Sequence, residues 1–392
     1  MSEEATALQI TDAEPFILAN IEAQLHSREN EEESAACQMI SGGPGIGKTW
    51  MMKQLCKKHD FGLVAKYMGT MMVEQITGLP KGLTDKDSKY TEWTIPELFS
   101  FRNMEVTPSS PDRPMILFLD DIHLANKSIQ SYQFQLLTYH GIHDHTLPDN
   151  VVILMAGNRS EDKAGFQQIM APVSNRMCFL NVKAEPNDWI ANYAVQAGIR
   201  HDIMSFIGNY PDMMESAPLE SAPWASPRSW TNASRALDAY EKRNPLNTQS
   251  LTSIVNGHVG SAGGTKFVEY RQLFMQWEAD KILDGTKKVT QKQLADFEKN
   301  RMGAYCLMSA MIAELTKRLR DNDFKLNPQI DKGIDIFRDL INHFSKHCRE
   351  IVPLGLKLLI LSEKHYSDDI TIARKLITDD YVVEALDEIV TG

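Results

Sequence analysis

The segment from Ile40 to Trp50, Ile-Ser-Gly-Gly-Pro-Gly-Ile-Gly-Lys-Thr-Trp, decides the fold of the region around it. Gly42 to Thr49 follows the pattern G-x-x-x-x-G-K-[ST] and comes directly after a short apolar stretch, Ala35 to Ile40. Glycines let consecutive backbone N–H groups turn inward around a polyphosphate, and the helix that follows points the positive end of its dipole at the same charge. The order strand, loop, helix therefore predicts a phosphate-binding loop and makes a chance match of flexible glycines the weaker interpretation.

This loop is expected to hold a nucleoside triphosphate together with Mg²⁺. Lys48 is expected to reach the β and γ phosphates, and the Thr49 hydroxyl is expected to hold the metal ion. The predicted nucleotide-binding residues are Gly42, Gly43, Pro44, Gly45, Ile46, Gly47, Lys48, Thr49 and Trp50.

A pair of acids follows the apolar run from Met115 to Leu119. Asp120 and Asp121 should therefore lie at the carboxyl end of a parallel strand, where open α/β sheets bind ligands. In P-loop ATPases the first acid at this place serves Mg²⁺ and the second polarises the attacking water. We predict Asp120 as a metal residue and Asp121 as a catalytic residue. The alternative is a pair of acids that caps the next helix.

A neutral polar residue, Asn158, ends the next apolar run, Val151 to Ala156. Beside the acids it could orient water and contact the γ phosphate through a hydrogen bond, without adding charge; alone it would be a turn residue. His123, two residues after the acid pair, has no evident partner in the sequence and is expected to be structural.

The composition suits a globular protein of more than one domain. The 392 residues exceed the usual size of one hydrophobic core, and 43% are hydrophobic and 24% charged. The net charge of −11 disfavours a surface built throughout to hold nucleic-acid backbones, although a local basic stripe inside an oligomer would not show in this total. Nucleic-acid binding is disfavoured but stays open.

The location of the protein is predicted from its cysteines and its apolar stretches. Five scattered cysteines without a C-x-x-C pair indicate reduced thiols of a cytoplasmic protein, and the acidic start, Met1 to Ala5, is unlike a secretion signal. The longest apolar stretch, Ile351 to Leu361, is too short to span a bilayer and is broken by Pro353 and Lys357. We expect no membrane association.

Apolar periodicity divides the chain into three predicted domains. An α/β nucleotide-binding domain with a parallel sheet and helices on both faces covers 1–185, a helical domain covers 186–278, and a C-terminal helical domain covers 279–392. Besides the strands already given, the pattern predicts strands over Phe61 to Met68 and Met177 to Val182. The predicted helices are Ala13 to Leu25, Lys48 to Lys58, Tyr305 to Arg318, Gly333 to Lys346 and Tyr381 to Ile389.

The order of these motifs resembles the AAA+ ATPases, and more narrowly their MoxR-like branch, in bacterial and phage members. Asn158 corresponds to sensor 1 of that family, Arg176 to its arginine finger and Arg228 to its sensor 2. The phrase Gly78-Leu79-Pro80 resembles a segment near the pore of MoxR relatives, and Gly257-His258-Val259-Gly260 resembles a phrase of the family's lid domain. The resemblance covers residues 10 to 278.

The resemblance implies an ATPase that uses ATP and Mg²⁺ and assembles as a homo-oligomeric ring, most often a hexamer. Arg176 would act on the nucleotide of the neighbouring subunit, and Arg228 on that of its own subunit, because arginine holds phosphate oxygens in a fixed fork. Arg159 competes with Arg176 for the finger role. Lid movement would remodel or chaperone a protein partner, which in MoxR relatives often carries a von Willebrand factor A domain.

One position departs from the family pattern, since most AAA+ relatives have glutamate where this chain has Asp121. The shorter side chain lies about one methylene further from the water, and small misplacements can cost about 10²-fold in rate. Hydrolysis is therefore expected to be slow, and a nucleotide-gated assembly that scarcely turns over is the alternative.

The sequence leaves three other classes of site or function open. A DNA-directed AAA+ accessory protein, such as a helicase loader or a replication or transposition factor, is the second hypothesis. A P-loop kinase or GTPase is the third, although the only Asn-Lys pair, Asn126-Lys127, does not continue as the guanine motif N-K-x-D. A metal site formed by His140, His143 and His145 is the alternative to a surface loop.

Overall fold

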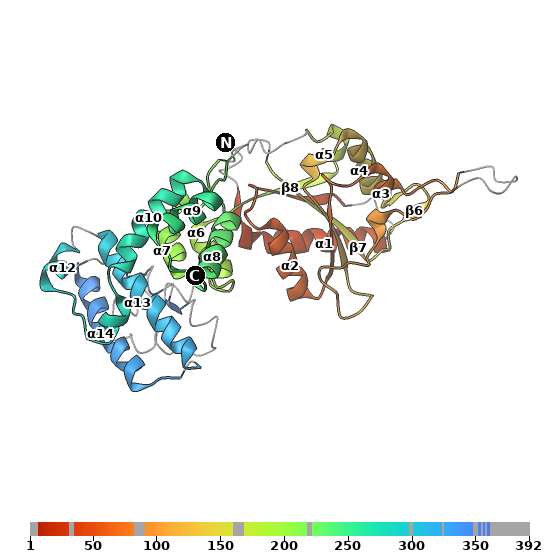
Figure 1. Ribbon diagram of the computed structural model, residues 1–392. Helices are drawn as coiled ribbons and strands as arrows, with labels where there is room; N and C mark the ends of the chain where they lie inside the picture. Colours follow the sequence, from red (N-terminus) through yellow and green to blue (C-terminus); the bar gives the residue numbers. More distant parts are fainter. Residues whose placement is uncertain are drawn as a thin grey trace. The chain divides into compact units, whose positions relative to one another are not determined.

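The computed structural model describes residues 7–30, 35–81, 91–159, 168–217, 222–297, 301–323, 325–347, 352–353, 356 and 359–360. The chain divides into two compact units, Met1–Ala184 and Glu185–Gly392, whose elements are labelled in Figure 1. The predicted boundary at residue 185 lies beside this division. The further division at residue 278 stays a prediction.

A six-stranded parallel sheet forms the centre of the first unit. Its strands, in spatial order, are β1 (Leu8–Gln9), β8 (Met177–Lys183), β2 (Cys37–Ser41), β7 (Val151–Gly157), β4 (Met115–Asp120) and β3 (Gly62–Tyr67). Each neighbouring pair is parallel. The predicted parallel P-loop sheet is therefore confirmed, and β1 is an addition to it, because two residues are too few to show any periodicity.

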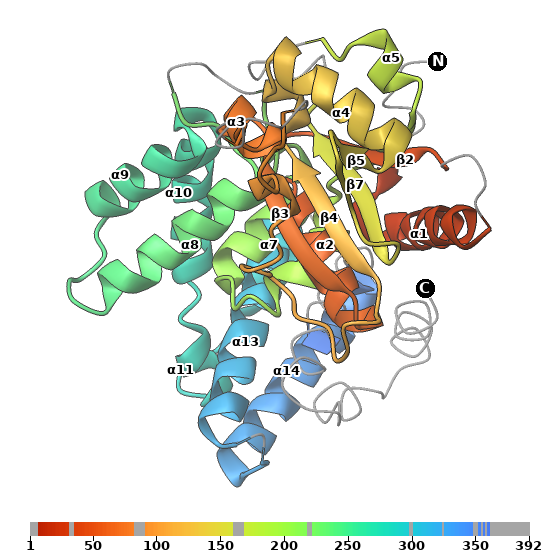
Figure 2. The same ribbon diagram turned by 90° about the vertical axis from the view of Figure 1, so that its right-hand side faces the viewer.

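Helices cover both faces of this sheet, which explains why β2, β4 and β7 are buried along their whole length. On one face Ile116 and Phe118 pack with α1 (Glu14–Glu29) and α2 (Lys48–His59). On the other face Leu117 and Leu119 pack with α3 (Val73–Thr77), α4 (Lys127–Tyr139) and α5 (Ala171–Ser174). Figure 2 shows α1 and α4 on different sides of the strands. Successive residues of a strand thus enter opposite cores.

Two short β-ribbons lie beside each other on this unit. One contains the bridge between Pro80 and Trp93, and the other is the hairpin of β5 (Gly141–Ile142) and β6 (His145–Thr146). The Trp93 and His143 rings stack with centroids 4.4 Å apart, and a ring nitrogen of His145 lies 3.0 Å from the Trp93 carbonyl. Within the described ranges no cluster of three histidine, cysteine or acidic residues could hold a metal ion. These histidines therefore join the two ribbons.

Helices make up the described part of the second unit. They are α6 (Pro186–Trp189), the π-helical turn η6 (Ile190–Ala194), α7 (His201–Asn209), the 3-10 turn η7 (Pro211–Met213), α8 (Pro227–Glu241), α9 (Thr248–Val259), α10 (Ser261–Met275), α11 (Ala279–Leu283), α12 (Gln291–Asp296), α13 (Arg301–Asp321) and α14 (Pro328–His347). The predicted helices within α13 and α14 are confirmed, whereas the one predicted over Tyr381 to Ile389 lies outside the described residues. Every helix within the described ranges is too short or too polar to span a bilayer.

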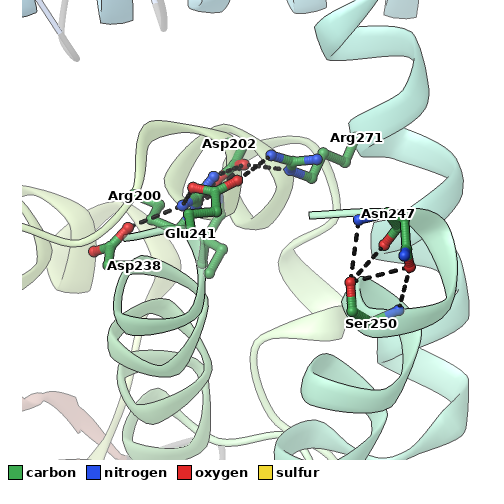
Figure 3. A network of polar contacts seen from close by, with 8 residues as sticks. Arg200, Asp202, Asp238, Glu241, Asn247, Ser250 and Arg271 are labelled. Atoms are coloured by element: carbon green, nitrogen blue, oxygen red, sulfur yellow. Dashed lines mark hydrogen bonds and ion pairs between the residues drawn. The ribbon is translucent and has the colours of Figure 1, made fainter. Parts of the chain in front are cut away.

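A network of charged side chains ties α7, α8 and α10 together (Figure 3). Arg200 lies 3.0 Å from Asp202 and 2.9 Å from Asp238, and both Arg200 and Arg271 contact Glu241. Arg271 also lies 2.9 Å from Asp202, which is 4% exposed. Burial alone would raise the pKa of Asp202, but the charges and hydrogen bonds of the two arginines outweigh it and lower this pKa.

Candidate functional site

The loop from Gly42 to Gly47 connects β2 to α2 at the carboxyl edge of the sheet. Gly47 has a φ of 109°, which strains any residue with a side chain. At Gly42 a Cβ atom would come within 2.6 Å of the Val182 carbonyl oxygen. Both positions require glycine for a physical reason, so the pattern read from the sequence matches the local backbone.

Lys48 connects this loop to the neighbouring strand β7. Its ammonium group donates to the carbonyl oxygens of Gly42 at 2.8 Å and Gly43 at 3.0 Å, and to Asn158 Oδ1 at 3.1 Å. The residue is only 7% exposed. The structure therefore brings together two site residues that lie 110 positions apart in the chain.

Thr49 and Asp120 also meet. The Thr49 hydroxyl donates to Asp120 Oδ2 at 2.6 Å, and the backbone N–H of Asp121 donates to Asp120 Oδ1 at 2.9 Å. Burial raises the pKa of Asp120, and the hydrogen bond from Thr49 acts in the opposite direction. A hydroxyl and a buried carboxylate are hard oxygen donors of the kind that Mg²⁺ prefers, and a cation beside them would favour the ionised carboxylate. The residues present thus fit a magnesium ion.

Asp121 follows β4 in an unusual backbone conformation, with φ 54° and ψ 41°. This left-handed region is uncommon for residues other than glycine, although a short polar side chain such as aspartate tolerates it. The residue begins the turn η4 (Ile122–Leu124) and is half-buried. Asp121 therefore stands at the carboxyl edge of the sheet beside Asp120, and its catalytic role stays a prediction.

Asn158 lies against His123, for which the sequence predicts a structural role. The backbone N–H of Asn158 donates to His123 Nδ1 at 3.1 Å, and Asn158 Nδ2 lies 3.2 Å from His123 Nε2. His123 is fully buried and Asn158 is 9% exposed. The signal in the sequence was the position of His123 two residues after the acid pair, which places it in η4 at the same edge of the sheet.

Arg176 lies at the opposite edge of the sheet from the loop. It directly precedes β8, and its carbonyl accepts from the N–H of Cys37 at the start of β2. Its guanidinium stacks 4.3 Å from the centre of the Phe134 ring and donates to the Pro172 carbonyl at 3.0 Å. Strand β2, which leads from this edge to the loop, spans about 13 Å, at about 3.3 Å a residue. The structure does not bring Arg176 to the loop of its own chain, whereas Arg159 follows β7 at the loop's edge.

Arg228 belongs to the helical unit. It is exposed in the first turn of α8, next to Pro227, and the helix begins with a capping box between Ser226 and Ser229. Its predicted contact with nucleotide stays a prediction.

Residues 38–177 match the family model of the ATPase family associated with various cellular activities (AAA). This range extends from β2 to the first residue of β8 and contains the phosphate-binding loop, the acid pair and Asn158. The chain therefore carries an AAA ATPase family domain with the P-loop fold of AAA+ proteins. The MoxR-like branch stays a prediction.

Two solved structures of RuvB from Thermotoga maritima, each with a single substitution, are similar to this chain. One is 14% identical over 81% of this chain and 90% of its own, with a TM-score of 0.34, and the other is 13% identical over 80% and 90%, with a TM-score of 0.31. Structural similarity at TM-scores this low does not indicate a shared function or shared partners. No curated protein matches the chain.

Proposed function

We propose that the protein is a Mg-ATP-dependent ATPase whose hydrolytic site is built at the carboxyl edge of the sheet. The observation that carries this proposal is that Lys48 meets Asn158 there while Thr49 meets Asp120. A cation for the phosphates, a neutral hydrogen-bonding group and an oxygen pair suited to Mg²⁺ thus share one edge. ATP hydrolysis requires all of these groups at one place. A cluster that only stabilised the fold would not require this combination.

Each residue then has a task that its chemistry allows. Lys48 neutralises charge on the β and γ phosphates, and Thr49 and Asp120 hold the Mg²⁺, which supplies electrostatic stabilisation when bound. Asp121 accepts hydrogen bonds from the attacking water and Asn158 orients the γ phosphate. Because aspartate is shorter than the usual glutamate, we propose slow turnover.

The position of Arg176 supports a ring. Arg176 lies beside the start of β2, and the loop follows the end of this strand, so the arginine suits a group that serves a neighbouring subunit. Its contact with Phe134 holds the guanidinium at this edge without neutralising it. The subunits would form a homo-oligomeric ring, with a hexamer as the expected size, and Arg228 would contact the nucleotide of its own subunit.

The work done by this ATPase is the remodelling or chaperoning of a protein partner in the cytoplasm. The sequence resemblance to the MoxR-like branch supports this part of the proposal, including a partner with a von Willebrand factor A domain. Hydrolysis would move the helical unit against the α/β unit and so change the partner's conformation.

The test is molar mass by light scattering, with and without Mg-ATP, together with phosphate release at several protein concentrations. The wild type should assemble, and its activity per subunit should rise with concentration. Arg176→Ala should lower activity by about 10³-fold, the value of an arginine supplied in trans. Arg102→Ala is the matched control, because Arg102 is exposed on the same unit.

Two outcomes would contradict parts of the proposal. A monomer under both conditions, with activity independent of concentration, would remove the ring. An unchanged rate of phosphate release for Asp121→Asn would show that Asp121 does not polarise the water.

A further inference from the structure

A buried histidine connects the acid pair to Asn158. His123 lies in η4, and its Nδ1 accepts from the backbone N–H of Asn158 at 3.1 Å. The ring packs so closely on the end of β7 that a Cβ atom on Gly157 would come within 3.1 Å of Nδ1. The position of the ring relative to Asn158 is therefore set by both a hydrogen bond and packing.

The hydrogen bond to Nδ1 also decides where the ring carries its proton. A backbone N–H can only donate, so Nδ1 must accept, and the neutral ring then carries its hydrogen on Nε2. Nε2 lies 3.2 Å from the Asn158 amide nitrogen Nδ2, which is itself a donor. The atom of this amide that could accept from Nε2–H is Oδ1.

A second donor holds that same oxygen. The Lys48 ammonium, which has only hydrogens to offer, lies 3.1 Å from Asn158 Oδ1. Lys48 and His123 thus contact opposite atoms of one amide, and each of them prefers its oxygen. A rotation of about 180° around the terminal torsion of Asn158 exchanges oxygen and nitrogen at almost no cost in shape. The orientation of the amide is therefore decided by which donor takes the oxygen.

We propose that His123 is a positioning residue that turns the Asn158 amide toward the nucleotide. A triphosphate draws Lys48 onto its β and γ phosphates, and His123 Nε2–H then takes the oxygen. The NH₂ group of Asn158 faces the γ phosphate as a donor. This inference rests on the proposed binding of ATP in the loop and adds the residue that selects the active orientation.

The consequence is a preference for ATP over ADP. Phosphate oxygens accept hydrogen bonds and repel another acceptor, so the orientation of Asn158 matters for a ligand that reaches it with a γ phosphate. ADP lacks this group. Loss of the His123 donor should therefore weaken the binding of ATP and leave the binding of ADP unchanged.

Two substitutions separate the two nitrogens of the ring. His123→Asn can keep an acceptor near the Nδ1 position and removes the donor at Nε2. His123→Gln can place an amide donor near the Nε2 position and loses the acceptor at Nδ1. The dissociation constants of a non-hydrolysable ATP analogue and of ADP would be measured by calorimetry for both variants, for Asn158→Ala, and for the double variant of His123→Asn with Asn158→Ala. Thermal melting reports on the fold.

We expect His123→Asn to reduce the ratio of ATP to ADP affinity about tenfold, the value of one hydrogen bond to a charged group. His123→Gln should keep most of this ratio. In the Asn158→Ala background the His123→Asn change should have no further effect on the ratio, because the amide through which it acts is gone.

Other results would overturn the inference. If His123→Asn weakens ATP and ADP equally, or has the same effect with and without Asn158, the ring only supports the fold. If His123→Asn keeps the ratio and His123→Gln loses it, the Nε2 donor is not the active group. A wild type that binds neither nucleotide would instead contradict the proposed function itself.

Discussion

Each unit of the protein buries charged side chains, but the two clusters are bonded in different ways. In the helical unit Asp202 lies between two guanidinium groups, those of Arg200 and Arg271 (Figure 3). In the α/β unit Lys48 donates to carbonyl and amide oxygens, and Asp120 accepts from a hydroxyl and an N–H. In the first cluster the hydrogen bonds themselves join opposite charges. In the second these hydrogen bonds are made to neutral groups, although the charge of Lys48 also acts on Asp120.

This difference has a physical meaning for function. Removing one member of a buried ion pair leaves an uncompensated charge, so such a cluster resists change and holds helices together. Hydrogen bonds to neutral groups are weaker and can be exchanged for bonds to a charged ligand. The α/β cluster can therefore accept phosphate and Mg²⁺, and the helical cluster acts as a fixed joint. Substitutions should affect stability in one cluster and nucleotide binding in the other.

The largest expected effect comes from Asp202→Asn. It replaces the buried carboxylate between Arg200 and Arg271 by a neutral amide, while Arg200 keeps Asp238 and Glu241 and Arg271 keeps Glu241. The free energy of unfolding of the helical unit should fall by about 3 kcal/mol, the lower end of the cost of a broken buried ion pair. Urea unfolding followed by circular dichroism measures this change. Asp212→Asn is the control, since Asp212 is exposed in η7. A loss below about 1 kcal/mol, as for a surface ion pair, would contradict the role of a fixed joint.

Lys48→Ala should have the opposite pattern. It removes the cation that reaches the phosphates, and ATP affinity should fall at least about hundredfold, or about 2.7 kcal/mol, while the melting temperature stays nearly the same. Lys57→Ala on the exposed side of α2 serves as the control for calorimetric titration. If Lys48→Ala unfolds the α/β unit instead, the role of Lys48 is to stabilise the fold and not to bind the nucleotide.

In acid the ion pairs of Asp202 should lose their contribution to the stability of the helical unit. The folded pKa of Asp202 is lowered, so its contribution to stability is fully present above its unfolded value of 3.8 and is lost as the pH falls through the folded value. The difference in unfolding free energy between wild type and Asp202→Asn should therefore be constant from pH 7 to pH 5 and shrink below about pH 3.8. Urea unfolding at pH 7, 5 and 3.5 tests this. A difference in unfolding free energy that grows in acid would contradict a lowered pKa of Asp202 in the folded protein.

The smallest effect should come from the start of α8. The Ser226 side chain accepts from the N–H of Ser229 and caps the helix that carries Arg228, so Ser226→Ala should cost about 1 kcal/mol. Gln249→Ala on the exposed surface of α9 is the control in the same urea experiment. An equal cost for both variants would show that the cap contributes nothing of its own. The nucleotide affinity of the Ser226→Ala variant, measured under conditions where it is fully folded, tests separately whether the cap positions Arg228 for nucleotide.

Much of the fold could be predicted because its signals are local. The loop around Lys48 has a fixed pattern, and the buried strands β4 and β7 appear as unbroken apolar runs. The acids at the end of β4 and Asn158 at the end of β7 follow from the rule that parallel strands end at one edge. The β5 and β6 ribbon contacts Trp93 through stacking and one hydrogen bond, a contact with no periodic signal, and β1 is too short to give one.

The sequence by itself determined which residues approach the phosphate-binding edge, because glycine conformations, apolar runs and strand ends are properties of short segments. Only the tertiary structure decided which of them touch. His123 meets Asn158 across 35 positions and Arg271 meets Asp202 across 69. Nothing local distinguishes these partners from other histidines and arginines, since the pairing energy arises only when folding removes both groups from water. The edge of the sheet was thus predictable, and the bond that orients its asparagine was not.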